Sequence, residues 1–114
     1  MQVVPVIARD AAVSTTDDEL ERYARRLVAR RQWTPARVAL HLASMRAPGD
    51  DRLRALMAYA GGHEAAERDD LDRARSEWER ALLLDPRLAD ARAALATLPG
   101  SLAWLRRWWR RAAR

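Results

Sequence analysis

Residues that could perform catalysis or bind a metal ion are scarce in this chain. The sequence contains two histidines, His41 and His63, and no cysteine. His63 is followed by Glu64 and Glu67, but the second histidine of the zinc-binding H-E-x-x-H motif is absent. Gly61-Gly62 lacks the spacing of a phosphate-binding G-x-x-x-x-G-K loop. We therefore expect a non-enzymatic protein with no catalytic residue, no metal and no cofactor.

The net charge of +5 lies in the last fourteen residues. All 21 basic residues are Arg, and five of them fall in 101–114, where there is no acid. The remaining 16 Arg are balanced by 16 Asp and Glu in 1–100. A neutral body with one short basic segment disfavours nucleic acid as a partner. It is compatible with a basic docking segment.

Apolar residues recur at helical spacing along most of the chain. Thr16 with Glu19 forms a capping box that predicts a first helix over 17–31. Thr34 is expected to cap a second helix that runs to about Arg46, and Asp69 or Asp70 to cap a fourth that ends at Leu84. We expect a third helix over 51–67 and a fifth over 88–98.

Three regions of different character follow from this pattern. Residues 1–15 contain β-branched residues and Pro5 without helical periodicity, so an extended or flexible arm is expected. Residues 16–98 form the helical domain. The break Pro99-Gly100-Ser101 precedes a predicted C-terminal helix over 101–114.

One pattern of small and large residues occurs twice, displaced by 38 residues. It consists of Ala74, Trp78, Ala81 and Pro86, and earlier of Ala36, Leu40, Ala43 and Pro48. The small residues allow a neighbouring helix to approach closely, and the larger residue fills the space between helices. Each proline ends its helix. The pattern therefore marks the second helix of a repeated helix–turn–helix unit.

The segment DLDRARSEWERALLLDP resembles the second half of a tetratricopeptide repeat, and the resemblance covers roughly 17–98. Gly62 and Ala24 lie twelve residues before Ala74 and Ala36, where the family has a small residue. Two departures are the 38-residue displacement, against a family period of 34, and a poorly kept W-x₂-L-G-x₂-Y signature. The resemblance implies an all-α fold of about two and a half repeats, followed by an amphipathic C-terminal helix.

In the tetratricopeptide family, the first helix of each repeat lines a groove that holds a partner peptide. The resemblance therefore implies a polar groove formed by Glu21, Arg25, Arg52, Tyr59, His63 and Asp90. The paired Lys and Asn residues of carboxylate-clamp members are absent, so binding of that kind is not implied. Taken singly, each of these side chains is also compatible with ordinary solvated surface.

The predicted C-terminal helix is strongly amphipathic. One face carries Trp104, Leu105, Trp108, Trp109 and Ala112, and the other carries Arg106, Arg107, Arg110, Arg111 and Arg114. This helix could cap the last repeat, with Arg stems covering the margin. It could also lie on an anionic membrane surface or dock on an acidic protein.

These patterns predict an adaptor, scaffold or chaperone that binds a partner protein within a larger assembly, such as a bacterial secretion system. Two and a half repeats are few for a continuous core, so the C-terminal helix, self-association or a partner would supply the missing contacts. The alternative is a membrane-peripheral scaffold that uses the Trp/Arg helix. We expect a cytoplasmic location, with membrane association in that second case.

Overall fold

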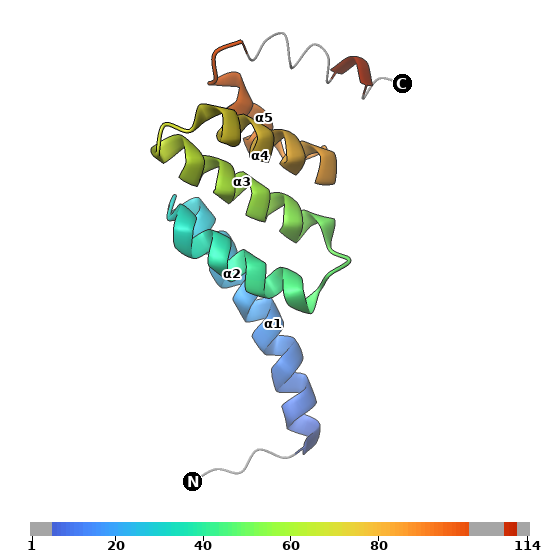
Figure 1. Cartoon of the computed structure of the whole chain (residues 1–114). Coiled ribbons are helices and arrows are strands. Elements are labelled where there is room, and N and C mark those ends of the chain that lie inside the picture. Colours follow the sequence, from blue (N-terminus) through green and yellow to red (C-terminus); the bar gives the residue numbers. More distant parts are fainter. Residues whose placement is uncertain (1–5, 101–108, 112–114) are drawn as a thin grey trace.

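The computed structural model describes residues 6–100 and 109–111, and every regular element in them is an α-helix (Figure 1). The helices are α1 (Val6–Ala29), α2 (Trp33–Arg46), α3 (Asp51–Glu67), α4 (Leu71–Leu84) and α5 (Ala89–Ala96). Residues 109–111 form a further helical turn. The predicted all-α class is therefore confirmed. None of the helices described is long and apolar enough to cross a membrane.

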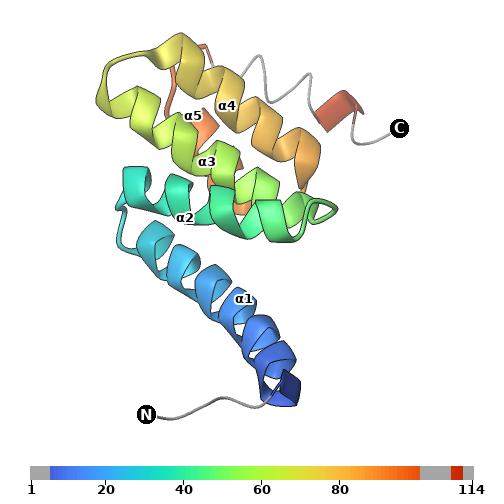
Figure 2. The same cartoon turned by 60° about the horizontal axis from the view of Figure 1, so that its bottom comes forward.

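Each helix packs mainly against its neighbours in the sequence, so α3 lies in the middle of the array. Figures 1 and 2 show α2, α3 and α4 side by side, with the N-terminal half of α1 extending beyond the other helices. Connections of three residues join α1 to α2 and α3 to α4, and connections of four residues join α2 to α3 and α4 to α5. Such short connections place consecutive helices as antiparallel neighbours.

The helix bounds repeat with the displacement seen in the sequence. Adding 38 to Trp33–Arg46 gives Leu71–Leu84, the bounds of α4. The turns repeat as well, because Arg31 and Asp69 both have φ near 59°. In each turn the preceding helix closes with the hydrogen bonds of a Schellman motif, such as Gln32 N to Leu27 O and Asp70 N to Ala65 O.

The residues of the repeated pattern form the core, as predicted. All six of the small and large residues are buried, namely Ala36, Leu40, Ala43, Ala74, Trp78 and Ala81. Pro48 and Pro86 each follow the last helical residue by two positions. Apolar burial at these positions stabilises the contacts of α2 and α4 with α3.

The two adjacent glycines of α3 have different roles. A Cβ at Gly62 would lie 2.5 Å from Trp78 Cδ1, closer than two carbon atoms can approach. At Gly61 the nearest atoms to such a Cβ would be Glu77 Oε2 at 3.4 Å and Arg37 Cδ at 3.7 Å, which are ordinary contact distances. Close helix contact therefore explains Gly62, and Gly61 lies at the surface.

The predicted N-terminal arm is wrong for residues 6–15, which belong to α1. Ala8, Ala11 and Ala12 favour a helix, and a β-branched residue costs only a few tenths of a kcal/mol relative to alanine. The predicted capping box of Thr16 and Glu19 therefore lies inside α1. Residues 1–5 are outside the described part of the chain.

The predicted starts of α3 and α4 are confirmed, and an Asp caps each of these helices. Asp50 and Asp70 accept backbone hydrogen bonds at the starts of α3 and α4. The prediction for Thr34 is wrong, because α2 already begins at Trp33 and its N-cap residue Gln32 makes no side-chain cap bond. Thr34 instead donates a hydrogen bond to Glu64 at 2.7 Å.

Glu64 joins α2 to α3. Its carboxylate accepts hydrogen bonds from Thr34 and from the Arg37 guanidinium, and the residue is 9% exposed. Burial alone would raise the pKa of Glu64, but these hydrogen bonds and the charges of Arg37 and Arg68 hold it below its ordinary value. Glu64 therefore remains charged at neutral pH.

The C-terminal end of α5 also differs from the prediction. The helix ends at Ala96, where Thr97 donates its hydroxyl to Ala94 O. Pro99 disfavours helical backbone at Leu98. Of the predicted helix over 101–114, only residues 109–111 lie within the described part, and they are helical.

Candidate functional site

The helix α3 presents two different faces on opposite sides. Tyr59 and His63 follow Arg52 by about two and three helical turns, so the three residues share one face. At about 100° per residue, Gly61 and Ala65 lie on the opposite side. The predicted groove residues belong to the first of these faces.

Four rings from three helices pack together at the first face. The imidazole of His63 stacks on the indole of Trp33, with centroids 4.0 Å apart and planes at 7°. Tyr59 meets His63 edge-on at 4.8 Å, and Trp78 lies 4.9 Å from His63. We call Trp33, Tyr59, His63 and Trp78 the aromatic cluster. It fixes the imidazole through contacts from α2, α3 and α4.

His63 is held in its neutral form. Its Nε2 is buried and has no hydrogen-bond partner in the described structure. Burial lowers its pKa to about 4, and the positive charge of Arg31 acts in the same direction, whereas Asp90 opposes the shift. The imidazole therefore presents an acceptor or a donor, but no charge, at neutral pH.

Two opposite charges influence this cluster from separate elements. Arg31, in the turn after α1, and Asp90, on α5, both act on Tyr59 and His63. Burial and Asp90 raise the pKa of Tyr59, while Arg31 lowers it. None of the ion pairs among the described residues involves Asp90. Both charges are exposed and can interact with a ligand.

Arg31 adopts a strained backbone conformation in this position. Its φ of 59° lies in the left-handed region, which costs about 1–2 kcal/mol for a residue other than glycine. Its guanidinium carbon is 5.9 Å from the ring centroid of Trp33, within reach of a cation–π interaction. We call Arg31, Trp33, Tyr59, His63 and Asp90 the Tyr59–His63 face.

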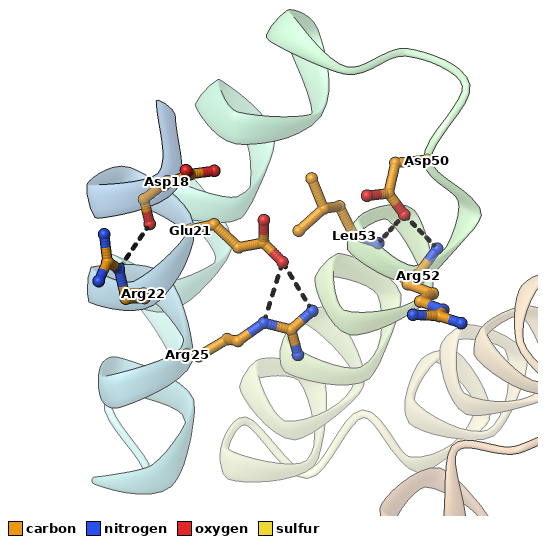
Figure 3. Close-up of polar contacts among 7 residues, drawn as sticks. All are labelled: Asp18, Glu21, Arg22, Arg25, Asp50, Arg52 and Leu53. Carbon is orange, nitrogen blue, oxygen red and sulfur yellow. Dashed lines mark hydrogen bonds and ion pairs between the residues drawn. The ribbon is translucent and has the colours of Figure 1, made fainter. Parts of the chain in front are cut away.

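Three of the six predicted groove residues belong to this face: Tyr59, which is buried, half-buried His63, which contacts it, and exposed Asp90, whose charge acts on both. Glu21 and Arg25 instead pair with each other on α1 at 2.9 Å (Figure 3). Arg52 is exposed at the start of α3, beside the cap formed by Asp50 (Figure 3). Arg52 precedes Tyr59 by seven residues, which places it about 10 Å away along the helix axis.

Sequence reasoning missed Arg31 and Trp33, which complete the face. The sequence places Arg31 at the end of the first predicted helix and Trp33 in the turn that follows it, and it indicates no role for either residue. Two signals were available. Trp33 directly precedes the helix start predicted at Thr34-Pro35, and the turn residues Arg31-Gln32 lie 38 residues before Asp69-Asp70. The part of the chain that the structure describes contains no group of three or more His, Cys, Asp or Glu that could hold a metal ion.

Part of the predicted C-terminal docking face is described. Trp109 is 54% exposed, and Arg110 and Arg111 are exposed beside it. The guanidinium carbon of Arg92, on α5, lies 5.3 Å from the Trp109 ring centroid. This contact places the 109–111 turn near α5. Trp104, Arg106, Arg107 and Trp108 lie outside the described residues.

Comparison of the chain with models of protein families, with curated proteins and with solved structures found no match.

Proposed function

We propose that this protein is a non-enzymatic interaction module, an adaptor, scaffold or chaperone, that holds a segment of a partner protein on the Tyr59–His63 face. The observation that carries the proposal is the buried, unpartnered Nε2 of His63, in a rigid aromatic cluster between two opposite charges. Buried polar atoms normally have a hydrogen-bond partner, and a peptide bound at this face could supply one to His63.

The strain at Arg31 supports the same proposal. Glycine would adopt φ of 59° without cost, yet a long cation occupies the position and interacts with Trp33. Strained residues concentrate at binding sites, where the position of the side chain matters more than backbone stability. A partner carrying a carboxylate near Arg31 and a cation near Asp90 would complement this face.

We further propose that the chain is a tetratricopeptide-like array. The support is the 38-residue displacement shared by the bounds of α2 and α4, by the left-handed turn residues and by the buried core positions. Arrays of this kind are binding scaffolds rather than catalysts. A role within a larger bacterial assembly, such as a secretion system, is part of this proposal.

Site-specific photo-crosslinking in cells of the source organism tests the proposal. A photoreactive residue at position 90 should crosslink to a partner protein, and one at exposed Asp72 on α4 should not. Arg31→Ala with Asp90→Ala should abolish capture of that partner by the full-length protein. The matched double change Arg26→Ala with Asp72→Ala removes the same charges from exposed positions and should leave capture intact. Equal loss in both double variants would contradict the proposal.

The exposed Trp109 beside Arg110 and Arg111 favours a second candidate function, a membrane-peripheral scaffold. Tryptophan and arginine together suit the interface of an anionic bilayer. The test is co-sedimentation with vesicles of phosphatidylglycerol and phosphatidylcholine. Replacing Trp104, Trp108 and Trp109 by Ala should abolish binding, and unchanged binding would exclude this function.

A further inference from the structure

A cavity of about 390 Å³ lies on the side of α3 opposite the Tyr59–His63 face. Gly61 and Ala65 of α3 form its floor, and side chains of α2 and α4 line its two sides. We call it the outer pocket. Its size is in the range of small-ligand sites.

Three arginines from different elements line the outer pocket. Arg37 comes from α2, Arg68 from the end of α3 and Arg73 from the first turn of α4. Arg37 is engaged by Glu64. In the described part of the chain, neither the Arg68 nor the Arg73 side chain forms an ion pair or hydrogen bond. Two guanidinium groups at the pocket are therefore available to a ligand.

The acids of the outer pocket form no ion pair with Arg68 or Arg73, although the charge of Arg68 acts on Glu64. Glu64 is bonded to Thr34 and Arg37, and Asp70 caps α4 by accepting a hydrogen bond from Arg73 N at 3.2 Å. Glu77 approaches the floor at Gly61 and forms no ion pair with another described residue. With three Arg and three acids, the formal charge of the lining is zero.

The absence of a side chain at Gly61 keeps the floor open. A Cβ there would already lie 3.4 Å from Glu77 Oε2 and 3.7 Å from Arg37 Cδ. A larger side chain would extend into the space between Arg37 and Glu77. Gly61 therefore allows a ligand group to reach the floor of the pocket.

From these contacts we propose that the outer pocket binds a single carboxylate group of a peptide, held by Arg68 and Arg73. A guanidinium matches the planar carboxylate with two parallel hydrogen bonds. Two unpaired guanidinium groups can bind one carboxylate, whereas Glu77 with Asp70 would repel the second charge of a phosphate. Glu77 can accept a hydrogen bond from an N–H next to the carboxylate. The site is separate from the Tyr59–His63 face.

The carboxylate could come from a chain terminus or from an acidic side chain, and NMR titration of the ¹⁵N-labelled full-length protein distinguishes the two sources. The probes are N-acetyl-trialanine with a free carboxylate, N-acetyl-Ala-Glu-Ala-amide, and neutral N-acetyl-trialanine-amide. Saturable shifts of the Gly61, Ala65, Arg68 and Arg73 amides with either acidic peptide, and not with the neutral one, are expected. The peptide that binds more tightly identifies the source. No saturable shift with either acidic peptide would overturn the proposal, as would inorganic phosphate binding as tightly as the better peptide.

Three variants localise the binding to the outer pocket. Arg68→Gln and Arg73→Gln should each weaken it by about tenfold or more, the effect of losing a charged hydrogen bond. Gly61→Leu should weaken it as strongly by filling the pocket while every arginine remains. Arg80→Gln, an exposed change on α4, is the control with the same loss of charge. A loss in Arg80→Gln equal to that in Arg73→Gln would overturn the proposal, because long-range charge would then explain the binding.

Discussion

The indole of Trp78 occupies the space that a side chain at Gly62 would need. A Cβ at Gly62 would lie 2.5 Å from Trp78 Cδ1, and Trp78 Nε1 donates a hydrogen bond to Tyr59 O at 3.0 Å. The close packing of α4 on α3 therefore also fixes the turn of helix that carries Tyr59 and His63. Stability and the candidate binding face depend on the same contact.

Gly62→Ala should destabilise the protein by about 1–3 kcal/mol, the usual cost of overpacking a buried site. The adjacent Gly61→Ala is the matched control and should stabilise it by about 0.5–1 kcal/mol, because alanine favours a helix and no close contact opposes it. Urea unfolding measures both free energies. Equal effects of the two substitutions would show that the Trp78 contact is not tight.

Trp78→Ala should cost about 3–5 kcal/mol, as expected for a large side chain that is 2% exposed. A near-neutral melting shift would contradict the packing described above.

The contact between Gly62 and Trp78 can be tested by a double-mutant cycle. The residues 38 positions earlier, Ala24 and Leu40, form a corresponding pair of a small and a larger residue, and both are fully buried. In a Trp78→Leu background, Gly62→Ala should no longer destabilise. Thermal unfolding of the wild type, the two single variants and the double variant measures the coupling between positions 62 and 78. Additive effects of the two substitutions would argue against a tight contact.

Neutral His63 should make stability depend on pH. Burial and the charge of Arg31 lower its pKa from 6.5 to about 4 in the folded protein, so protonation is disfavoured there more than in the unfolded chain. The resulting stabilisation is complete above pH 6.5 and is lost as pH falls from 6.5 towards 4. His63→Gln should remove this loss, and His41→Gln, at an exposed position, should retain it. Unfolding free energies at several pH values test this, and identical curves for both variants would contradict it.

The two left-handed turn residues should respond differently to glycine. Asp69→Gly should stabilise the protein by about 0.5–1 kcal/mol by relieving the backbone. Arg31→Gly should stabilise it less, because the cation–π contact with Trp33 is lost. It should also raise the pKa of His63, which NMR titration measures. An unchanged His63 pKa in Arg31→Gly would remove Arg31 from the Tyr59–His63 face.

Much of the fold was predictable because its signals are local. The bounds of α3 agree with the predicted range of about 51–67, because the break Pro48-Gly49-Asp50 separates it from α2. The start of α1 was predicted ten or more residues too late, because an N-terminal stretch with β-branched residues was weighed above its alanines. Of the candidate site, Tyr59, His63 and Asp90 were found, whereas Arg31 and Trp33 were missed because their contacts cross between elements.

The sequence by itself determined the 38-residue displacement, the helices that carry it and the buried small and large residues. These features depend on spacing along one helix and on residues that end helices, which neighbouring positions reveal. Only the tertiary structure decided which of two adjacent glycines must remain small, that Thr34 and Arg37 bind Glu64, and that an arginine-lined pocket faces away from the aromatic cluster. Each of these depends on contacts between residues 16 or more positions apart, which no local pattern encodes.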